Sequence, residues 1–440
     1  MGAVEHISQQ FERFAGELPG TWPDALSARR REAISRFGEI GFPSRRAEQW
    51  RFINLNPITE TQFGLPGTVE GLTVRDLQPY VYEGSWQVVL VNGRFHAELS
   101  QLEGLPEGVI VDSLANVAAS QPDLVERFVG RFARFEDHPF VALNTAFLSD
   151  GAFIYVPRGT VVEAPINLIC LGAPETGPVA SYPRNLIATE ESSQVTVVEQ
   201  YASLGDGVYM TSPVTEVAAG PNSVIDHYKL QRESVDAIHM ATFQIHQQRD
   251  SNVSSHSISW GGALVRNDVN AVLDGEGCLA TLNGLYMVEG DQQIDNHMRM
   301  DHAQPNCDSH ELYKGILEGK ARAVFNGLIH VHPGAQKTDA KQTNRNLLLS
   351  DDALVNSHPQ LEIFADDVKC THGSTTGHLD DVAVFYLRSR GIGEEAARSL
   401  LTYAFAADIV ERIQVPSVRH ELEEFLFRRL PKGEVVRQAV

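Results

Sequence analysis

The stretch PQLEIFADDVKCTHGSTTGHLDDVAVFYLRSRG, residues 359–391, passes from a strand pattern to a helix pattern. It opens with alternating residues, among which Leu361, Ile363 and Ala365 would share one face of a strand. From Asp380 onward it reads as a helix. The stretch therefore marks the border between a β-rich region before it and a helical region after it.

The same stretch holds a candidate metal-ligand pair, Cys370 and His372. Two residues apart on a strand, their side chains point to the same face. A soft thiolate beside an imidazole suits iron, zinc or copper(I). Two ligands alone do not make a metal site, so a packed thiol and a hydrogen-bonded histidine are the alternative that the residues leave open.

Residues 139–379 show almost no helical pattern, and instead contain short alternating segments separated by Gly, Asn, Asp and Pro. Such a run predicts a β-sandwich, a barrel or a β-helix. The length of the region favours the β-helix, and so do outward positions rich in His, Gln, Asn and Ser, which suggest two water-exposed outer faces. No hexapeptide or nonapeptide repeat is present. The clearest alternating segments are 152–156, 164–171, 194–201, 224–231, 241–248, 253–260 and 278–288.

Residues 1–138 are expected to be mostly helical. A helix over 25–41 would end at Gly41, and another is expected over 121–132. Between them, residues 86–95 predict a strand pair joined by an Asn-Gly turn.

Residues 380–440 are also expected to be helical. A helix over 393–413 would end before Pro416, and Ser417 would cap a second helix. We expect this pair to close the open end of the β-helix, where unpaired backbone groups would otherwise be exposed. The apolar stripe of the first helix would consist of Ala397, Leu400, Leu401, Ala404, Ile409 and Ile413, and that of the second of Leu422, Phe425 and Leu426.

Bulk composition excludes several classes of function. A net charge of −21 argues against nucleic-acid binding. No run of about 18 apolar residues and no secretory signal pattern occurs, so no membrane association is expected. The four cysteines are scattered and form no CxxC, which favours a reducing, cytoplasmic location. No phosphate-binding loop is found, so any ATP hydrolysis would belong to a partner.

Two further groups of possible ligands occur before residue 359. His330 and His332 in HVHP have the spacing seen in cupin-like metal sites, but the carboxylate and distant histidine that such sites need cannot be located. Residues 295–310 hold three histidines, a cysteine and three aspartates. We expect HVHP to be exposed polar positions on a coil, and residues 295–310 to be a solvated loop or coil edge.

Several motifs together closely resemble the SufB/SufD family of iron–sulfur cluster assembly proteins, and its SufD branch more than its SufB branch. ADDVKCTHGSTTG at 365–377 and FYLRSRGI at 385–392 match the SufD-like pattern. The resemblance extends to AQKTDAKQTNRNLLLS at 335–350, HELYKGIL at 310–317 and GFPSRRAEQWRF at 41–52.

The resemblance implies a right-handed parallel β-helix core and a non-catalytic scaffold. Such a scaffold pairs with a SufB-like subunit and docks a SufC-like ABC ATPase on its C-terminal helices, here 393–430. The family histidine that matches His372 is proposed to help hold the nascent cluster or iron at the SufB–SufD interface, and Cys370 is the second candidate. A flavin has been reported on the complex, and no cofactor is expected to bind the isolated chain tightly.

Two alternatives remain open at this point. One is a standalone enzyme, either a carbohydrate-active β-helix or a cupin-like metalloenzyme that uses His330 and His332. The other is a homodimer whose C-terminal sheet edge pairs with itself, because an unpaired edge tends to find a partner.

Overall fold

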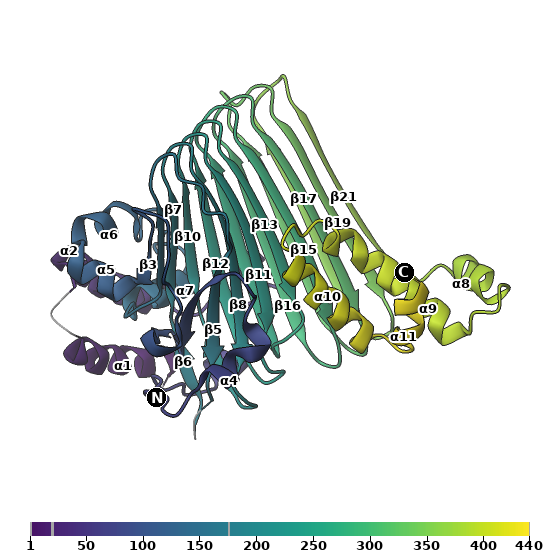
Figure 1. Cartoon of the computed structure of the whole chain (residues 1–440), viewed down its shortest axis with the longest axis horizontal. Coiled ribbons are helices and arrows are strands. Elements are labelled where there is room, and N and C mark those ends of the chain that lie inside the picture. The colour runs from purple at the N-terminus through teal and green to yellow at the C-terminus, as the bar shows by residue number, and fades with distance from the viewer. Residues whose placement is uncertain (1, 19–21, 175–176, 440) are drawn as a thin grey trace.

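The computed structural model describes residues 2–18, 22–174 and 177–439. Its core is a parallel β-solenoid of two facing sheets, with helices at the N-terminal end and along one side (Figure 1). Sheet A has the order β20-β18-β16-β14-β12-β10-β7-β4-β3, and sheet B the order β2-β1-β5-β8-β11-β13-β15-β17-β19-β21. The predicted β-helix with flanking helices is therefore confirmed, whereas the division at residues 138 and 379 stays a prediction.

From β10 to β21, the strands alternate between the two sheets along the chain. Those of sheet A are β3 (Ile110–Ser113), β4 (Ala152–Val156), β7 (Arg184–Thr189), β10 (Val214–Ala219), β12 (Ile238–Gln247), β14 (Leu264–Leu273), β16 (Gln293–His302), β18 (Arg322–Val331) and β20 (Leu354–Ile363). Those of sheet B are β1 (Trp86–Val91), β2 (Arg94–Phe95), β5 (Ile166–Gly172), β8 (Gln194–Ser203), β11 (Val224–Arg232), β13 (Asn252–Ser259), β15 (Leu279–Val288), β17 (Asp308–Leu317), β19 (Asp339–Leu348) and β21 (Lys369–Gly377). Short β6 (Val179–Ser181) pairs with β9 (Tyr209–Thr211), and β9 pairs with β12, so both belong to sheet A as a side branch.

The helices lie at both ends of the chain. They are α1 (Ala3–Glu17), α2 (Asp24–Ile40), α3 (Asn56–Thr59), α4 (Val74–Leu77), α5 (Leu114–Ser120), α6 (Pro122–Phe128), α7 (Pro139–Ala146), α8 (Asp381–Arg388), α9 (Glu394–Val410), α10 (Pro416–Arg429) and α11 (Gly433–Ala439). None of the helices in the described part of the chain is both long and apolar enough to cross a membrane.

The repeat of the solenoid is a structural period and not a short sequence motif. Leu264, Gln293 and Arg322 stand opposite one another on adjacent strands, so one turn takes 29 residues there. The next turn, from Arg322 to Leu354, takes 32 residues. The sequence shows no hexapeptide or nonapeptide repeat, because what recurs from turn to turn is only the inward or outward direction of the side chains.

Strand alternation builds the interior. Ile245, Ala271, Met300 and Ile329 form a column of mutually stacked, fully buried side chains on sheet A. Their sequence neighbours point outward, as the period of two requires. Such columns bury a continuous core along the solenoid axis, so each coil is stabilised by the coils on either side of it.

A buried charged group fixes the N-terminal helical region to sheet A. The Glu216 carboxylate accepts from the backbone N–H groups of Gly130, Phe132 and Ala133 at 2.6, 2.9 and 3.0 Å. It also pairs with Arg184 at 2.7 Å, and both side chains are buried. Because every charge here has a partner, this carboxylate can be buried without a large penalty.

Two of the three local predictions for the N-terminal region are confirmed, whereas the described helices occupy less than half of residues 1–138 and do not make the region mostly helical. Gly41 ends α2 with a positive φ of 61°. Asn92 and Gly93, with φ of 49° and 79°, turn β1 into β2, as an Asn-Gly hairpin predicts. The helix expected over 121–132 is shorter, because α6 ends at Phe128 and the following residues bend back to reach Glu216.

The expectation that both outer faces are exposed to water is wrong. The helices α9 and α10 pack their apolar residues on the outer face of sheet B, against Tyr228, Ile258, Leu285 and Ile316 among others. The helices α5 and α6 cover outward residues of β4, β7 and β10. The polar outward residues are therefore confined to the parts of each sheet that no helix covers.

The prediction that the C-terminal helices close the end of the solenoid is also wrong, since they run along the side of sheet B (Figure 1). Two details of these helices differ as well. Ser417 is not the cap of α10, which starts at Pro416 after Val415. Ala404 is exposed, because the buried side of α9 runs through Ala406, Ile409 and Val410 instead.

Both sheets consequently end in an uncovered strand. β20 is the last strand of sheet A and β21 the last strand of sheet B. Most residues of β21 are exposed, whereas its neighbour β19 alternates between buried and exposed residues. The C-terminal end of the solenoid thus presents two open sheet edges, which is where a further strand can pair.

The stacked interior predicts a position-dependent cost of truncation. Ile329→Ala removes a fully buried side chain from the column and should lower the free energy of unfolding by about 2–5 kcal/mol. Ile363→Ala is the matched control, because Ile363 is 38% exposed on the edge strand β20, and it should cost less than about 1 kcal/mol. Chemical denaturation measures both. Equal costs would contradict the assignment of Ile329 to a continuous core.

Candidate functional site

The predicted ligand pair Cys370 and His372 lies on the interior-facing side of the last coil. In the register of β19 and β21, Cys370 stands opposite Ala340 and His372 opposite Gln342. Ala340 and Gln342 are both buried inside the solenoid. Their counterparts on β21 therefore also face the interior, but no following coil covers them.

This position explains the different environments of the two side chains. His372 is exposed, and Cys370 is half-buried against the apolar core. Burial raises the pKa of the Cys370 thiol, which favours the protonated form. In the described residues the pair has no third metal ligand within reach of one ion, so it is at most part of a site.

Polar groups line the interior beneath His372. Gln342 donates to the Glu311 carboxylate at 2.7 Å, one coil further in. Burial raises the pKa of Glu311 to about 7. Between the sheets, Ser374 donates to Ser357 at 2.7 Å. The interior at the open end is therefore lined by polar side chains, unlike the apolar columns deeper in sheet A.

The backbone of β21 offers a regular row of free donors. Lys369 donates its backbone N–H to Thr338 on the preceding coil. In a parallel ladder the alternate residues 370, 372, 374 and 376 therefore direct their backbone N–H groups away from that coil, toward the open end. In β20, Leu354 and Phe364 donate to the preceding coil, so the odd-numbered residues direct their backbone N–H groups toward the open end. Pro359 is one of these and lacks a donor, so the edge of β20 is interrupted and that of β21 is not.

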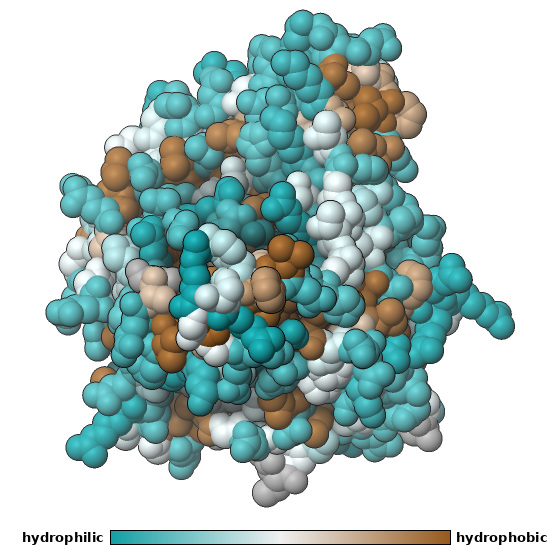
Figure 2. Space-filling model, turned by 90° about the vertical axis from the view of Figure 1, so that its right-hand side faces the viewer, coloured by the Kyte–Doolittle hydropathy of each residue, from teal (hydrophilic) through white to brown (hydrophobic). Residues whose placement is uncertain are grey.

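The helix α8, which follows β21, projects away from the rest of the molecule (Figure 1). Its N-cap Asp380 accepts from the backbone N–H of Val382 at 2.9 Å, which confirms the predicted helix start. Val382, Phe385 and Tyr386 are 73%, 69% and 52% exposed. Figure 2 views the molecule from this side and shows hydrophobic patches set among hydrophilic surface.

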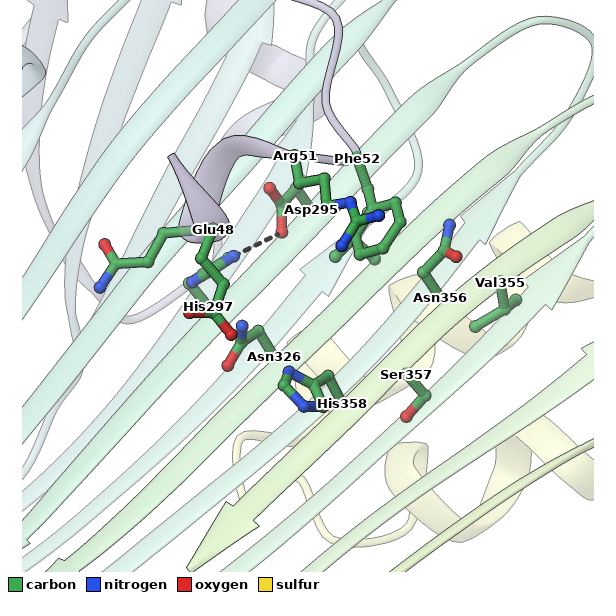
Figure 3. A pocket seen from close by; sticks show the side chains of 12 residues that line it. Glu48, Arg51, Phe52, Asp295, His297, Asn326, Val355, Asn356, Ser357 and His358 are labelled. Carbon is green, nitrogen blue, oxygen red and sulfur yellow. Dashed lines mark ion pairs between the residues drawn. The ribbon is translucent and has the colours of Figure 1, made fainter. Parts of the chain in front are cut away.

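The N-terminal motif at 41–52 anchors a loop on sheet A. Trp50 lies under the Arg266 guanidinium at 3.7 Å, and Arg266 also donates to the Gln49 carbonyl and pairs with Asp268 and Asp295. Beside this anchor is a cavity of about 420 Å³ between the loop and β16, β18 and β20 (Figure 3). Its lining residues include Glu48, Arg51, Phe52, His297, Asn326 and His358.

Residues 295–310 are not the solvated loop that the sequence suggested. They span β16 and the start of β17, and Asp295 and His302 are buried. Burial raises the pKa of Asp295 to about 7 and lowers that of His297 to about 3. The alternation of the strand hides some of these polar residues and leaves others outside, which composition alone could not reveal.

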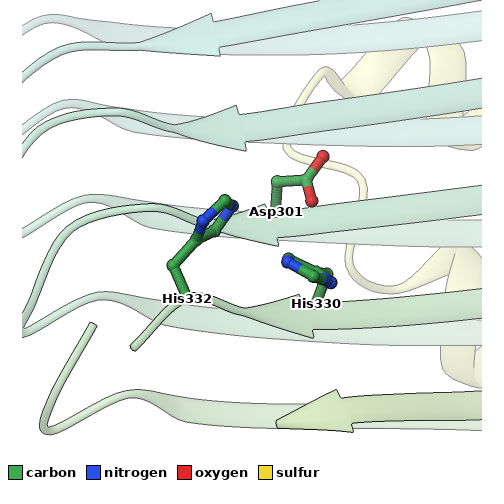
Figure 4. A group of neighbouring side chains, drawn as sticks. All are labelled: Asp301, His330 and His332. Carbon is green, nitrogen blue, oxygen red and sulfur yellow. The ribbon is translucent and has the colours of Figure 1, made fainter. Parts of the chain in front are cut away.

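The structure places one carboxylate, that of Asp301, beside the two histidines of HVHP, where the sequence alone had located none. Ligand atoms of Asp301, His330 and His332 all lie within 4.8 Å of one another (Figure 4). The group sits on the outer face of sheet A of a solenoid and not inside a barrel, so a cupin-like fold is wrong, whereas metal binding by His330 and His332 stays a prediction. The only sequence signal for Asp301 is its distance of one turn from His330, which becomes visible once the register is known.

A buried ionic network inside the N-terminal coils was missed altogether. Glu199 pairs with His227 at 2.8 Å, and both are buried. Burial opposes ionisation of Glu199, but the hydrogen bond and charge of His227 prevail and lower its pKa to about 2. Burial lowers the pKa of the nearby Lys229 to about 8. No spacing pattern marks these residues, because they lie on different coils.

The Glu311 carboxyl predicts a pH-dependent stability. Its folded-state pKa, about 7, lies above its ordinary value of 4.5, so the folded chain favours the protonated form and loses stability as pH rises through this window. Glu311→Gln should match the unmodified chain near pH 5 and exceed it by up to about 3 kcal/mol at pH 8. Chemical denaturation at several pH values tests this. The exposed Glu107→Gln serves as control, and a gap that does not grow with pH would refute the assignment.

Comparisons with known proteins identify the family. A family model described as the SUF system FeS cluster assembly SufBD core domain matches residues 171–405, and the SufBD protein N-terminal region matches residues 3–168. An iron–sulfur cluster assembly SufBD family protein of Synechocystis is 32% identical over 417 residues, which cover 92% of each chain.

Two proteins named SufD are similar as well. Iron–sulfur cluster assembly protein SufD of Escherichia coli is 32% identical over 412 residues, covering 92% of this chain and 94% of the relative. SufD of Bacillus subtilis is 29% identical over 346 residues, with coverages of 76% and 77%. The chain belongs to the SufBD family of SUF-system iron–sulfur cluster assembly proteins.

Proposed function

We propose that this chain is the SufD-type scaffold subunit of an iron–sulfur cluster assembly complex and has no catalytic site of its own. The observation that supports this most directly is the uncapped end of the solenoid, where an unbroken row of backbone donors on β21 lies beside the inward-facing His372. An open edge invites a strand from another chain. The nascent cluster is the cargo of this site.

The partner that fits this edge is a SufB-like homologue with the same solenoid. Two solenoids that meet end to end can continue each other's sheets through parallel or antiparallel ladders. The interrupted edge of β20 favours pairing through β21. In this arrangement His372 would face the partner, which supplies the remaining cluster ligands, and Cys370 is an additional candidate. Self-pairing into a homodimer is the arrangement expected when the partner is absent.

An ABC-type ATPase is the second proposed partner. The ATPase would dock on residues 393–430 of this chain, as the resemblance implies, and its contact would extend to α8. Because α9 and α10 use one side to pack on sheet B, the exposed apolar residues Val382, Phe385 and Tyr386 of α8 offer additional contact area. ATP-driven closure of that partner would move the scaffold chains and open their interface.

The four free cysteines fit a reducing cytoplasm. A flavin could bind the assembled complex only.

His372 can be tested separately from folding. His372→Ala removes an exposed side chain that makes no hydrogen bond or ion pair with the described part of the chain, so stability and complex formation should persist. The iron and acid-labile sulfide recovered with the complex should fall by more than about half. Metal and sulfide analysis of the anaerobically purified complex measures this. The control is His310→Ala, an exposed histidine on β17. Unchanged iron in the His372 variant would remove this residue from the function.

The proposed edge pairing predicts a directional effect of proline. Ser374→Pro deletes a donor that faces outward, so the chain should fold while recovery of the SufB-like partner falls at least about tenfold. The ATPase should still be recovered, because α8 and α9 lie outside the edge. Affinity purification with mass spectrometry measures both partners.

Two controls accompany this experiment. Thr375→Pro deletes a donor that faces β19, and it should destabilise the chain itself. Ser374→Ala removes only the hydroxyl contact to Ser357 and should retain the partner. If Ser374→Pro leaves recovery of the SufB-like chain unchanged, β21 is not the pairing edge.

A further inference from the structure

A column of ionisable side chains crosses the outer face of sheet A near the ends of three adjacent strands. Asp301 on β16 stands opposite His330 on β18, which stands opposite Glu362 on β20. His332 follows β18 directly, and its backbone N–H donates to the His302 carbonyl at 3.0 Å, which fixes the start of the turn. Four potential ligand residues thus converge from three coils.

The geometry is that of a coordination site and not only of an ion pair. One ligand atom from each of Asp301, His330 and His332 lies within 4.8 Å of the other two, a spacing that one ion can span. The two imidazoles are nearly perpendicular, with ring centroids 4.6 Å apart. Figure 4 shows the three side chains next to one another, with Asp301 above His330 and the His332 ring to their left.

Glu362 orients one of the imidazoles. Its carboxylate lies 2.9 Å from His330 Nδ1. If that nitrogen carries the proton, Nε2 keeps a free lone pair for a metal, which is the usual carboxylate–histidine–metal arrangement. The side chains of His330 and Asp301 are only 18% and 16% exposed, so their positions are restricted by packing.

We infer that Asp301, His330 and His332, supported by Glu362, bind a first-row divalent transition-metal ion of the Fe²⁺ and Zn²⁺ class. Two imidazoles and a carboxylate suit these ions, whereas Mg²⁺ and Ca²⁺ require mainly oxygen ligands. Three protein ligands leave coordination positions open to water or a further ligand. Strand alternation separates this site from the interior-facing His372, so the inference does not depend on the proposed function.

Arg299 would compete with the metal for the Asp301 carboxylate. Its guanidinium donates to both oxygens of Asp301 at 2.8 Å each, while its side chain is 45% exposed and can move away. Each carboxylate oxygen keeps a second lone pair for coordination. Removal of Arg299 should therefore strengthen metal binding, which is the opposite of what a purely structural ion-pair network predicts.

Titration of the isolated full chain with Co²⁺ tests the inference, because its visible absorption reports nitrogen and oxygen ligation. One Co²⁺ per chain should bind, Zn²⁺ at equal concentration should displace it, and a large excess of Mg²⁺ should not. The double variant His330→Ala/His332→Ala should weaken binding more than about 100-fold, and Glu362→Gln about tenfold or more. Arg299→Gln should tighten it. Circular dichroism confirms that each variant is folded.

His372→Ala and His310→Ala are the matched controls and should bind Co²⁺ as the unmodified chain does. Binding that persists in the double histidine variant, or displacement by Mg²⁺, would overturn the inference. So would a loss of binding in His372→Ala, which would place the metal at the end of the solenoid instead.

Discussion

The parallel backbone ladder between successive coils is the constraint on which the rest of this structure depends. Each strand is held by the strand one turn before and one turn after it, and the register is maintained from β5 to the last coil. Pairing on both sides satisfies the backbone N–H and C=O groups of the inner strands, whereas the strands at the ends of each sheet keep one unpaired edge. At the C-terminal end nothing in the described chain covers β20 and β21, because the helices that follow turn aside to cover sheet B.

The same ladder decides what each polar side chain can do. Strand alternation directs the His372 side chain toward the interior at the open end of the solenoid. It directs the His330 side chain, one coil earlier, to the outer face of sheet A. Stacking at the ladder spacing then brings residues a full turn apart into contact, such as Gln342 with Glu311 and Asp301 with His330. Chemistry in this fold is therefore arranged along columns that cross the strands.

Buried charges have a second role in the N-terminal half. Glu216 connects the residues after α6 to sheet A, and Arg266 connects the loop at Trp50 to the same sheet further along. These contacts hold irregular segments on a regular surface, because each buried charge is neutralised and hydrogen-bonded. The family motif at 41–52 thus has a structural explanation: it supplies the aromatic ring and carbonyl group that Arg266 contacts.

The local patterns of the sequence determined that the core is built of strands. Alternation over residues 139–379 left a sandwich, a barrel or a β-helix open, and the length of the region favoured the β-helix. Gly41 and the Asn92-Gly93 pair predicted a helix end and a hairpin, and Asp380 predicted the start of α8, because each depends on residues close in the chain. The sequence also singled out Cys370 and His372 as a pair that shares one strand face. What remained undetermined was every contact across coils.

Only the tertiary structure decided which face each helix covers, that the end of the solenoid stays open, and that Asp301 lies beside His330 and His332. Ser417 and Ala404 were misassigned for the same reason, since packing of α9 and α10 on sheet B overrode local preference. The turn length is not constant, since a turn takes 26 residues from Ile238 to Leu264 and 32 from Arg322 to Leu354, so the register that creates these contacts cannot be read from a fixed spacing. It emerges when each coil stacks its buried side chains on the coil before it.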